Sequence, residues 1–222
     1  MSKLVAHAKR IFAKHGKPKF RSTYAENPRP VHILDIGVAN ASYAECKHVY
    51  PTSIYHGLDI SDIDFELDVG DIFVRKNLED DCALDSFLPI YDLIIINHVM
   101  EHINNGALVF KKLAALLRLG GVLYAEFPSI RTSYRKQIGS SYHFHEDPTH
   151  KTFYVLEDLA NIAMKSGCQI VSCGPVSDPP LKILISGPRA LFNMFRGRGF
   201  FRFLPWDTRK IDHILIKKIS NE

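Results

Sequence analysis

The feature that most constrains the fold is the stretch Val31–Ser42, which reads VHILDIGVANAS. Its first residues form a short apolar burst that stops at Gly37, and Asn40–His48 then has the pattern of a helix. A short apolar burst is typical of a buried parallel strand. A turn of small residues between such a strand and a helix exposes backbone N–H groups at the positive end of the helix dipole. The stretch therefore predicts a strand, a ligand-binding turn and a helix.

A second apolar burst, Ile54–Leu58, ends at Asp59. An acid at the end of a second strand, about twenty residues beyond such a turn, can accept hydrogen bonds from both hydroxyls of a ribose. The pair of features predicts a nucleoside pocket at the carboxyl edge of an open sheet.

The rest of the chain continues to alternate between strand and helix patterns. Further strands are predicted at Phe65–Val69, Leu93–Ile96, Val122–Phe127, Gln169–Cys173 and Ile211–Ile219. Further helices are predicted at Leu78–Phe87, Asn104–Leu117 and Val155–Ser166. This alternation predicts an α/β fold, in which a parallel sheet carries helices on both faces.

The composition excludes some classes of protein but does not by itself indicate a function. The 222 residues suit one large domain, and a formal net charge of +4 is too small to indicate a nucleic-acid partner by itself. The four cysteines lack CxxC spacing, which favours reduced thiols over a disulfide framework or a zinc site. The sequence shows no apolar run long enough to span a membrane, and its first residues lack the apolar core that we would expect of a secretory signal. We therefore expect a cytoplasmic enzyme.

Two segments stand apart from the predicted core, which we take as a domain over residues 31–222. Residues 1–30 read as an amphipathic helix followed by a linker, and residues 181–206 as a basic and aromatic insertion inside the final hairpin. Residues 1–30 are expected to pack against the domain and residues 181–206 to cap the active site, with peripheral membrane contact as the alternative for both. For residues 181–206, binding of a phosphorylated or glycosylated acceptor is a further alternative. Base stacking on nucleic acid is disfavoured because no known nucleic-acid module is present.

The order of the motifs resembles a known family. DIGVANAS, LDI, YDLIIINHVMEHI, LRLGGVLYAEFPS and HFHEDPTHKTFYVLEDLANIAMKSG follow one another as in the class I S-adenosylmethionine-dependent methyltransferases. The likeness is strongest to the small-molecule branch with a V-x-E-H motif after the fourth strand, and it covers about Val31–Cys173. It implies a Rossmann-like, doubly wound sheet of seven strands, mostly parallel with an antiparallel last strand. It also implies S-adenosylmethionine as cofactor and S-adenosylhomocysteine as product.

The resemblance implies that Asp35, Gly37 and Ala39 form the turn beneath the methionine part of the cofactor. The family turn is G-x-G-x-G, whereas this chain has alanine at 39 and 41. Alanine narrows the pocket and disfavours left-handed backbone angles. A non-catalytic binding module that retains the fold is therefore kept as an alternative.

The resemblance also implies the residues around the adenosine. Asp59 would bind the ribose hydroxyls and Ile60 would lie against the adenine. Asp68 would hold the adenine amino group, with Asp71 as a competitor. Asn97, together with the histidine after it, would line the floor near the methyl group.

Methyl transfer to oxygen requires a base with a pKa near neutrality, and histidine suits that role. The richest patch, residues 142–150, reads YHFHEDPTH. We predict His145 as the base, oriented by Asp147 or Glu146, with His143 and His98 as the other candidates. A divalent metal held by the H-x-H-x4-H pattern that ends at His150 is a less favoured alternative.

The predicted function is methyl transfer from S-adenosylmethionine to a small-molecule acceptor, with a hydroxyl favoured as the methylated group. A sugar in glycan or natural-product biosynthesis would fit. The weaker alternative, an NAD-dependent oxidoreductase, lacks the G-x-G-x-x-G fingerprint that it would need.

Overall fold

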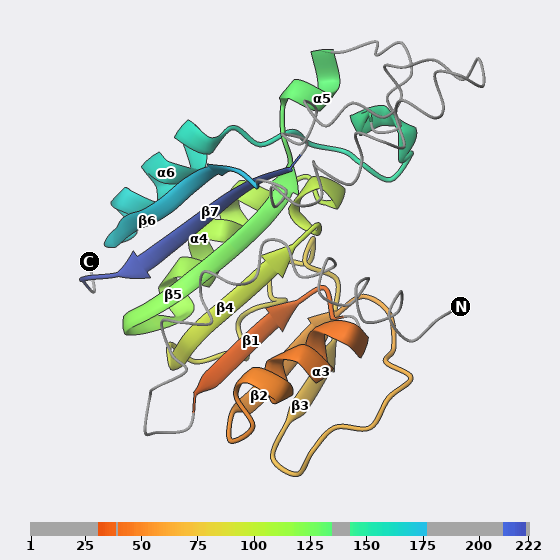
Figure 1. The fold of residues 1–222 in the computed structure, drawn as a ribbon, viewed down its shortest axis with the longest axis vertical. Coiled ribbons are helices and arrows are strands. Elements are labelled where there is room, and N and C mark those ends of the chain that lie inside the picture. The colour runs from red at the N-terminus through yellow and green to blue at the C-terminus, as the bar shows by residue number, and fades with distance from the viewer. Residues whose placement is uncertain (1–30, 39, 135–142, 177–210, 221–222) are drawn as a thin grey trace, which may run out of the picture.

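The computed structural model describes residues 31–38, 40–134, 143–176 and 211–220. These residues form a sheet of seven strands in the order β3-β2-β1-β4-β5-β7-β6 (Figure 1). The strands are β1 (His32–Ile36), β2 (Ile54–Asp59), β3 (Ile72–Arg75), β4 (Tyr91–Asn97), β5 (Leu117–Pro128), β6 (Cys168–Pro175) and β7 (Ile211–Lys218). The predicted N-terminal helix and the 181–206 insertion lie outside the described residues.

The direction of the strands confirms the predicted fold class. β1 lies between β2 and β4 and is parallel to both, with Ile33 opposite Tyr55 on one side and Leu93 on the other. β3 and β5 extend the parallel part of the sheet. β7 is antiparallel to both β5 and β6, so the predicted closing hairpin is present. The result is a doubly wound, mostly parallel Rossmann-like sheet with an antiparallel last strand.

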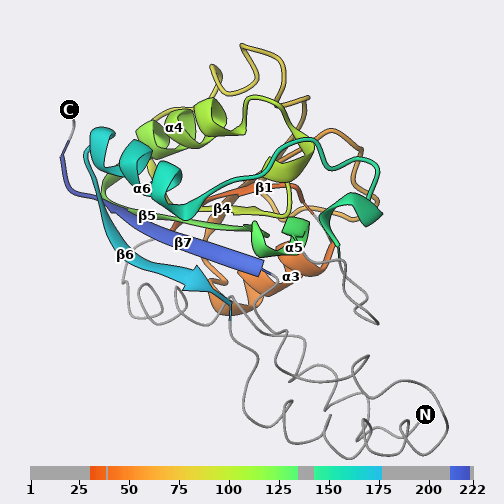
Figure 2. The ribbon, with the colours of Figure 1, turned by 90° about the horizontal axis from the view of Figure 1, so that it is seen from above.

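Helices cover both faces of the sheet. Helix α3 (Asn40–Val49) lies on one face, and α4 (Gly106–Leu116) and α6 (Leu156–Lys165) lie on the other (Figure 2). Side chains alternate along the central strands, so Ile33 of β1 packs on the α3 side while Leu34 packs on the α4 side. Both faces of the central strands are therefore buried, as the continuous apolar runs predict.

The boundaries of α6 follow from local chemistry. Glu157 and Asp158 lie in its first turn and Lys165 in its last, which complements the helix dipole. Gly167, with φ +67°, follows the last turn and takes the left-handed angle that ends many helices.

The predicted third strand, Phe65–Val69, is wrong: the strand that pairs with β2 is Ile72–Arg75. The alternating pattern in this segment has another cause. Phe65 and Leu67 are half-buried against the α3-side core, and Phe65 stacks on Tyr43 with ring centroids 5.2 Å apart. The alternation of apolar residues therefore marks burial at Phe65 and Leu67 but not at Val69, which is exposed, and it does not mark a strand of the sheet.

The predicted helix over Leu78–Phe87 is also wrong. The segment is a series of turns whose N–H groups donate to carbonyls three residues back, as Ala83 does to Asp80 at 3.0 Å. Aspartates are poor helix formers and are frequent here. The buried Leu78, Ala83 and Leu84 still anchor the segment in the core.

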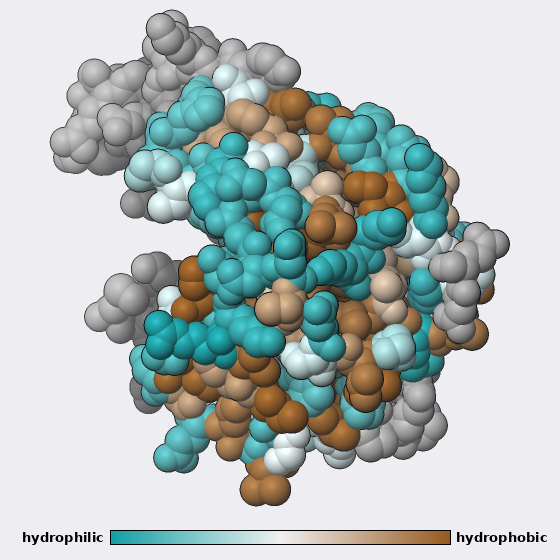
Figure 3. Space-filling model, turned by 180° about the vertical axis from the view of Figure 1, so that it is seen from behind, coloured by the Kyte–Doolittle hydropathy of each residue, from teal (hydrophilic) through white to brown (hydrophobic). Residues whose placement is uncertain are grey.

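The surface shows no single apolar face in the view from behind, where hydrophobic patches are interrupted by hydrophilic residues (Figure 3). Within the described part of the chain, none of the helices has the length and apolarity that a membrane crossing requires. All four cysteines are free, with Cys46 and Cys168 buried and the other two exposed.

Candidate active site

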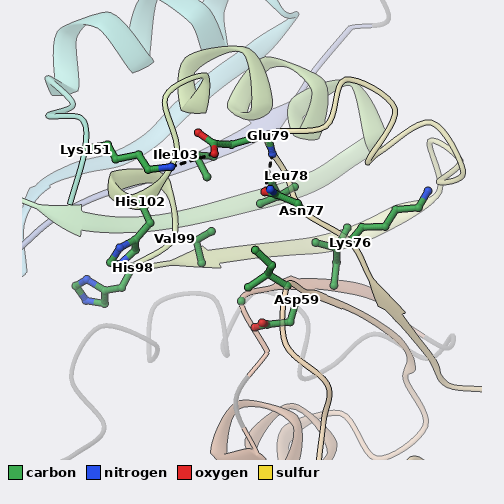
Figure 4. A pocket seen from close by; sticks show the side chains of 13 residues that line it. Asp59, Lys76, Asn77, Leu78, Glu79, His98, Val99, His102, Ile103 and Lys151 are labelled. Atoms are coloured by element: carbon green, nitrogen blue, oxygen red, sulfur yellow. Dashed lines mark hydrogen bonds and ion pairs between the residues drawn. The ribbon is translucent and has the colours of Figure 1, made fainter. Parts of the chain in front are cut away.

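A cavity of about 250 Å³ opens at the carboxyl ends of β1, β2 and β4 (Figure 4). Its walls come from five parts of the chain. They are the β1 turn (Gly37), the end of β2 (Leu58, Asp59, Ile60), the segment after β3 (Lys76, Asn77, Leu78, Glu79), the segment after β4 (His98, Val99, His102, Ile103) and Lys151, which follows the short helix η2 (Phe144–Glu146). This is the edge at which ligands bind in open α/β sheets.

Gly37 sets the shape of the cavity at the end of β1. Its φ is +78°, and its N–H donates to the Leu58 carbonyl at 2.9 Å. A Cβ at this position would lie 2.3 Å from Cγ2 of Val99, so only glycine fits without displacement. The predicted partner Ala39 lies outside the described residues.

Asp59 and Ile60 both line the cavity, where sequence reasoning puts them. Oδ1 of Asp59 accepts the Ser61 N–H at 2.8 Å, which fixes the carboxylate at the end of β2. Ile60 is 62% exposed and offers an apolar surface at the rim. Their roles toward the cofactor stay predictions.

Three predicted cofactor residues lie outside the cavity wall. Asp35 is buried and accepts hydrogen bonds from the hydroxyls of Ser42 and Tyr55, so it ties β1 to α3 and β2. The side chain of Asp68 is 67% exposed and lies 3.4 Å from Nζ of Lys47. Asn97 ends β4, and its Oδ1 is buried without a partner among the described residues.

Asp71, the predicted competitor of Asp68, also has another task. Its buried carboxylate accepts from Lys47, from the Tyr43 hydroxyl at 2.9 Å and from the Tyr55 N–H at 2.9 Å. It therefore fixes α3 and β2 to the loop before β3.

Sequence reasoning missed the wall that follows β3. Asn77 lies just beyond the end of that strand, the place predicted for Asp68, and its Oδ1 accepts the Glu79 N–H at 3.0 Å. Glu79 accepts from the Asn104 N–H at 3.0 Å and pairs with Nζ of Lys151 at 3.0 Å. No sequence motif marks Asn77 or Glu79. Only a correct placement of β3 would have indicated that they line the cavity.

His98 occupies a distinctive position. Its φ of +55° makes it the one non-glycine residue with positive φ among the described residues. Such strain persists only where the surroundings impose it, and it is frequent at functional sites. Nδ1 of His98 lies 3.1 Å from Oε1 of Glu101, and Nε2 lies 4.0 Å from Oε2 of Glu126.

The environment of His98 acts on its charge in two opposite ways. Burial lowers the pKa of its imidazole. The hydrogen bond and the charge of Glu101, together with the charge of Glu126, raise that pKa by more than burial lowers it. The net result is a pKa above the ordinary histidine value.

A second cavity, of about 730 Å³, adjoins the first, and His98 and His102 line both. Its other walls are Glu101, His143, Glu146, Asp147, Pro148, His150 and Ile211. His143 lines the second cavity, whereas His145 is exposed and lies outside both cavity walls, and the role of either as a base stays a prediction. Phe144 between them is buried and packs against Phe153 with ring centroids 3.7 Å apart.

The methyltransferase domain family matches residues 7–173, and the chain belongs to it. The predicted class, the class I S-adenosylmethionine-dependent methyltransferases, is thereby confirmed, and the protein is an enzyme of that class. No curated protein matches the chain by sequence.

Solved structures share the fold at low sequence identity. A methyltransferase described as S-adenosylmethionine-dependent, from Archaeoglobus fulgidus, is 20% identical with a TM-score of 0.55, over 97% of this chain and 94% of that one. An O-methyltransferase from a Brevibacillus brevis polyketide synthase, in complex with S-adenosylhomocysteine, is 15% identical with a TM-score of 0.52, over 90% and 71%. A Burkholderia thailandensis N1-methyltransferase with bound 1,6-didemethyltoxoflavin and S-adenosylhomocysteine is 13% identical with a TM-score of 0.54, over 96% and 84%.

Proposed function

We propose that this methyltransferase transfers a methyl group from S-adenosylmethionine to a hydroxyl of a small-molecule acceptor. The observation that carries the proposal is the pair of adjoining cavities that share His98 and His102. In-line displacement requires donor and acceptor on opposite sides of one carbon, and two adjoining cavities with shared wall residues support such an arrangement.

The donor occupies the cavity at the strand ends. Asp59 accepts hydrogen bonds from the ribose hydroxyls, and Ile60 lies against the adenine. Asn77 replaces Asp68 at the adenine edge, because it stands at the end of β3 while Asp68 faces solvent. Gly37 lets the methionine part approach the backbone of the β1 turn.

The acceptor occupies the cavity lined by His143 and His150, and His98 is the favoured base. Nδ1–H of a neutral His98 donates to Glu101, which leaves the lone pair of Nε2 to take the hydroxyl proton. The acceptor oxygen then bonds to the methyl carbon while the carbon–sulfur bond breaks. The electron pair of the broken carbon–sulfur bond stays on sulfur, and neutral S-adenosylhomocysteine leaves.

The acceptor class rests on the histidines, since a hydroxyl needs a base more than an amine does. The named neighbours act on different atoms, so they do not narrow it. A sugar in glycan or natural-product biosynthesis stays the finer proposal. A cytoplasmic location belongs to the same proposal and is supported by the four free cysteines.

The direct test has two arms. Calorimetric titration of S-adenosylhomocysteine should show binding to one site, and a panel of small hydroxyl, amine and thiol compounds should receive label from S-adenosylmethionine carrying a radioactive methyl. Label on hydroxyl compounds supports the proposal. Label only on amines or thiols would overturn the acceptor class.

The titration and the labelling assay together separate this proposal from the alternatives. The match to the methyltransferase domain family argues against the non-catalytic module that the alanines of the β1 turn suggested, and such a module would show no transfer to any acceptor. An NAD-dependent oxidoreductase predicts that NAD binds at least as tightly as S-adenosylhomocysteine.

A further inference from the structure

A cluster of three metal-ligating side chains lies in the wall of the second cavity. Glu101, His102 and His150 each offer one ligand atom, and these three atoms lie within 4.8 Å of one another. Glu101 and His102 belong to the short helix η1 (Met100–His102), and His150 follows η2 (Phe144–Glu146). Two segments about fifty residues apart in the chain therefore bring the three together.

Glu101 is the strongest sign that the cluster binds something. Its side chain is 1% exposed, and His98 bonds its Oε1. Its Oε2 is buried and has no hydrogen-bond partner among the described residues. A buried carboxylate oxygen without a partner is costly, and each such group calls for an explanation.

The two histidines are held in the tautomer that a metal requires. Nδ1 of His150 lies 2.8 Å from the carbonyl oxygen of Phe144, which can only accept, so Nδ1 carries the proton. Nδ1 of His102 lies 2.8 Å from Oγ1 of Thr149, and that hydroxyl already donates to Asp147.

Nδ1 of His102 is therefore the donor in its contact as well, and both rings keep their lone pair on Nε2. Hydrogen bonds that fix the second ring nitrogen in this way are the usual support of metal-bound histidine.

We propose that Glu101, His102 and His150 bind a divalent transition-metal ion at the edge of the second cavity. Two imidazoles and one carboxylate suit ions of the zinc, cobalt, iron and manganese group. Metal–ligand bonds of about 2.1 Å would need the three ligand atoms to draw somewhat closer together. Of the histidine pattern that sequence reasoning offered for a metal, only His150 belongs to this cluster.

The role of the ion rests on the proposed function, although its binding does not. With three protein ligands the ion keeps coordination positions for the acceptor. An acceptor hydroxyl bound there would have a lowered pKa and would release its proton to His98 more readily.

A different pairing competes with the metal. Nε2 of His150 lies 3.8 Å from Oδ2 of Asp147, so a doubly protonated His150 could form an ion pair instead. That pairing leaves Oε2 of Glu101 unexplained, and it predicts no affinity for metals.

The test is a titration of metal-stripped full-length protein with Co²⁺, followed by its visible absorption, and with Zn²⁺ by calorimetry. We expect one ion per chain. His150→Ala and the near-isosteric Glu101→Gln should each weaken binding at least tenfold. His48→Ala, an exposed histidine on α3, is the matched control and should bind as the wild type does.

No binding by the wild type, or equal affinity in His150→Ala and the wild type, would overturn the metal site. Circular dichroism melts show whether each variant folds. If His150→Ala does not fold, the comparison of metal affinity is made with Glu101→Gln. S-adenosylhomocysteine is titrated into the same preparations. Its binding without metal binding rejects only the metal site, whereas the failure of both rejects the proposed function as well.

Discussion

The cavity that contains Gly37 and Asp59 is built largely from strand ends, whereas the cavity that contains His150 is built from short loops and helical turns far apart in the chain. Strand ends are held by the ladder on both sides, as β1 is by β2 and β4. The loops are held by side chains, such as His150 bonded to the Phe144 carbonyl. This difference supports the proposed assignment of the first cavity to the cofactor and of the second to the acceptor.

The largest expected effect is on the strand-end cavity. Gly37→Ala places a Cβ 2.3 Å from Val99 at a φ of +78°. We expect a loss of about 2–4 kcal/mol in the free energy of unfolding, from overpacking and left-handed strain together, and loss of S-adenosylhomocysteine binding. Denaturant melts and calorimetry measure both.

Gly70→Ala is the matched control, because Gly70 has φ +93° but open space around it. It should cost only the backbone strain, about 1 kcal/mol, and leave cofactor affinity unchanged. Equal losses in the two variants would show that the contact with Val99 is unimportant.

The second largest effect is expected on turnover, from a change at His98 in the wall that the two cavities share. His98→Asn keeps a residue that tolerates positive φ but cannot take a proton. The turnover of whichever acceptor the panel identifies should fall about 100-fold or more, with cofactor affinity within a few-fold of the wild type. Steady-state kinetics and calorimetry separate the two quantities.

His145→Ala sharpens the same comparison. His145 is exposed and outside both cavity walls, so we expect turnover within a few-fold of the wild type. A large fall in His145→Ala with none in His98→Asn would restore the assignment made from sequence.

A smaller effect is expected at the ribose. Asp59→Ala should weaken S-adenosylhomocysteine binding by about 1–3 kcal/mol, the size of a lost hydrogen bond to a charged group. Asp68→Ala is the control and should leave the dissociation constant unchanged, because that carboxylate faces solvent. The opposite result would return the cofactor contact to Asp68.

The smallest effect concerns the clamp formed by Glu79, Asn104 and Lys151. Hydrogen bonds from the Asn104 N–H and from Lys151 lower the pKa of Glu79. Because the pKa of Glu79 is lowered in the folded state, its ionised carboxylate contributes to the free energy of unfolding above the ordinary pKa of glutamate. That contribution is lost as the pH falls through the lowered pKa. Glu79→Gln should therefore melt below the wild type at neutral pH and converge with it in acid. A gap in melting temperature that stays constant with pH would contradict this reading.

The sequence was sufficient for the parts of the molecule that depend on local pattern. The bursts ending at Gly37 and Asp59 identified β1, β2 and the cavity between them, because a buried parallel strand must be apolar and its end must turn. The seven-stranded, mostly parallel sheet with its antiparallel last strand and final hairpin followed from the family resemblance and is confirmed, whereas the order of the strands comes from the structure.

The region between β2 and β4 could not be predicted in the same way. The alternation at Phe65 and Leu67 reflects packing against Tyr43 rather than a ladder, so the strand was placed too early and Asp68 was preferred to Asn77. The cluster of Glu101, His102 and His150 was equally hidden, because a tertiary contact joins two segments that no local pattern connects.

We propose that the cavity at the ends of β1, β2 and β4 holds the cofactor, and a crystal structure of the protein with S-adenosylhomocysteine would test this. We expect the ribose at Asp59, the adenine beside Ile60 and Asn77, and the sulfur toward His98. Density for the ligand at any other place, with this cavity filled by protein side chains, would contradict it.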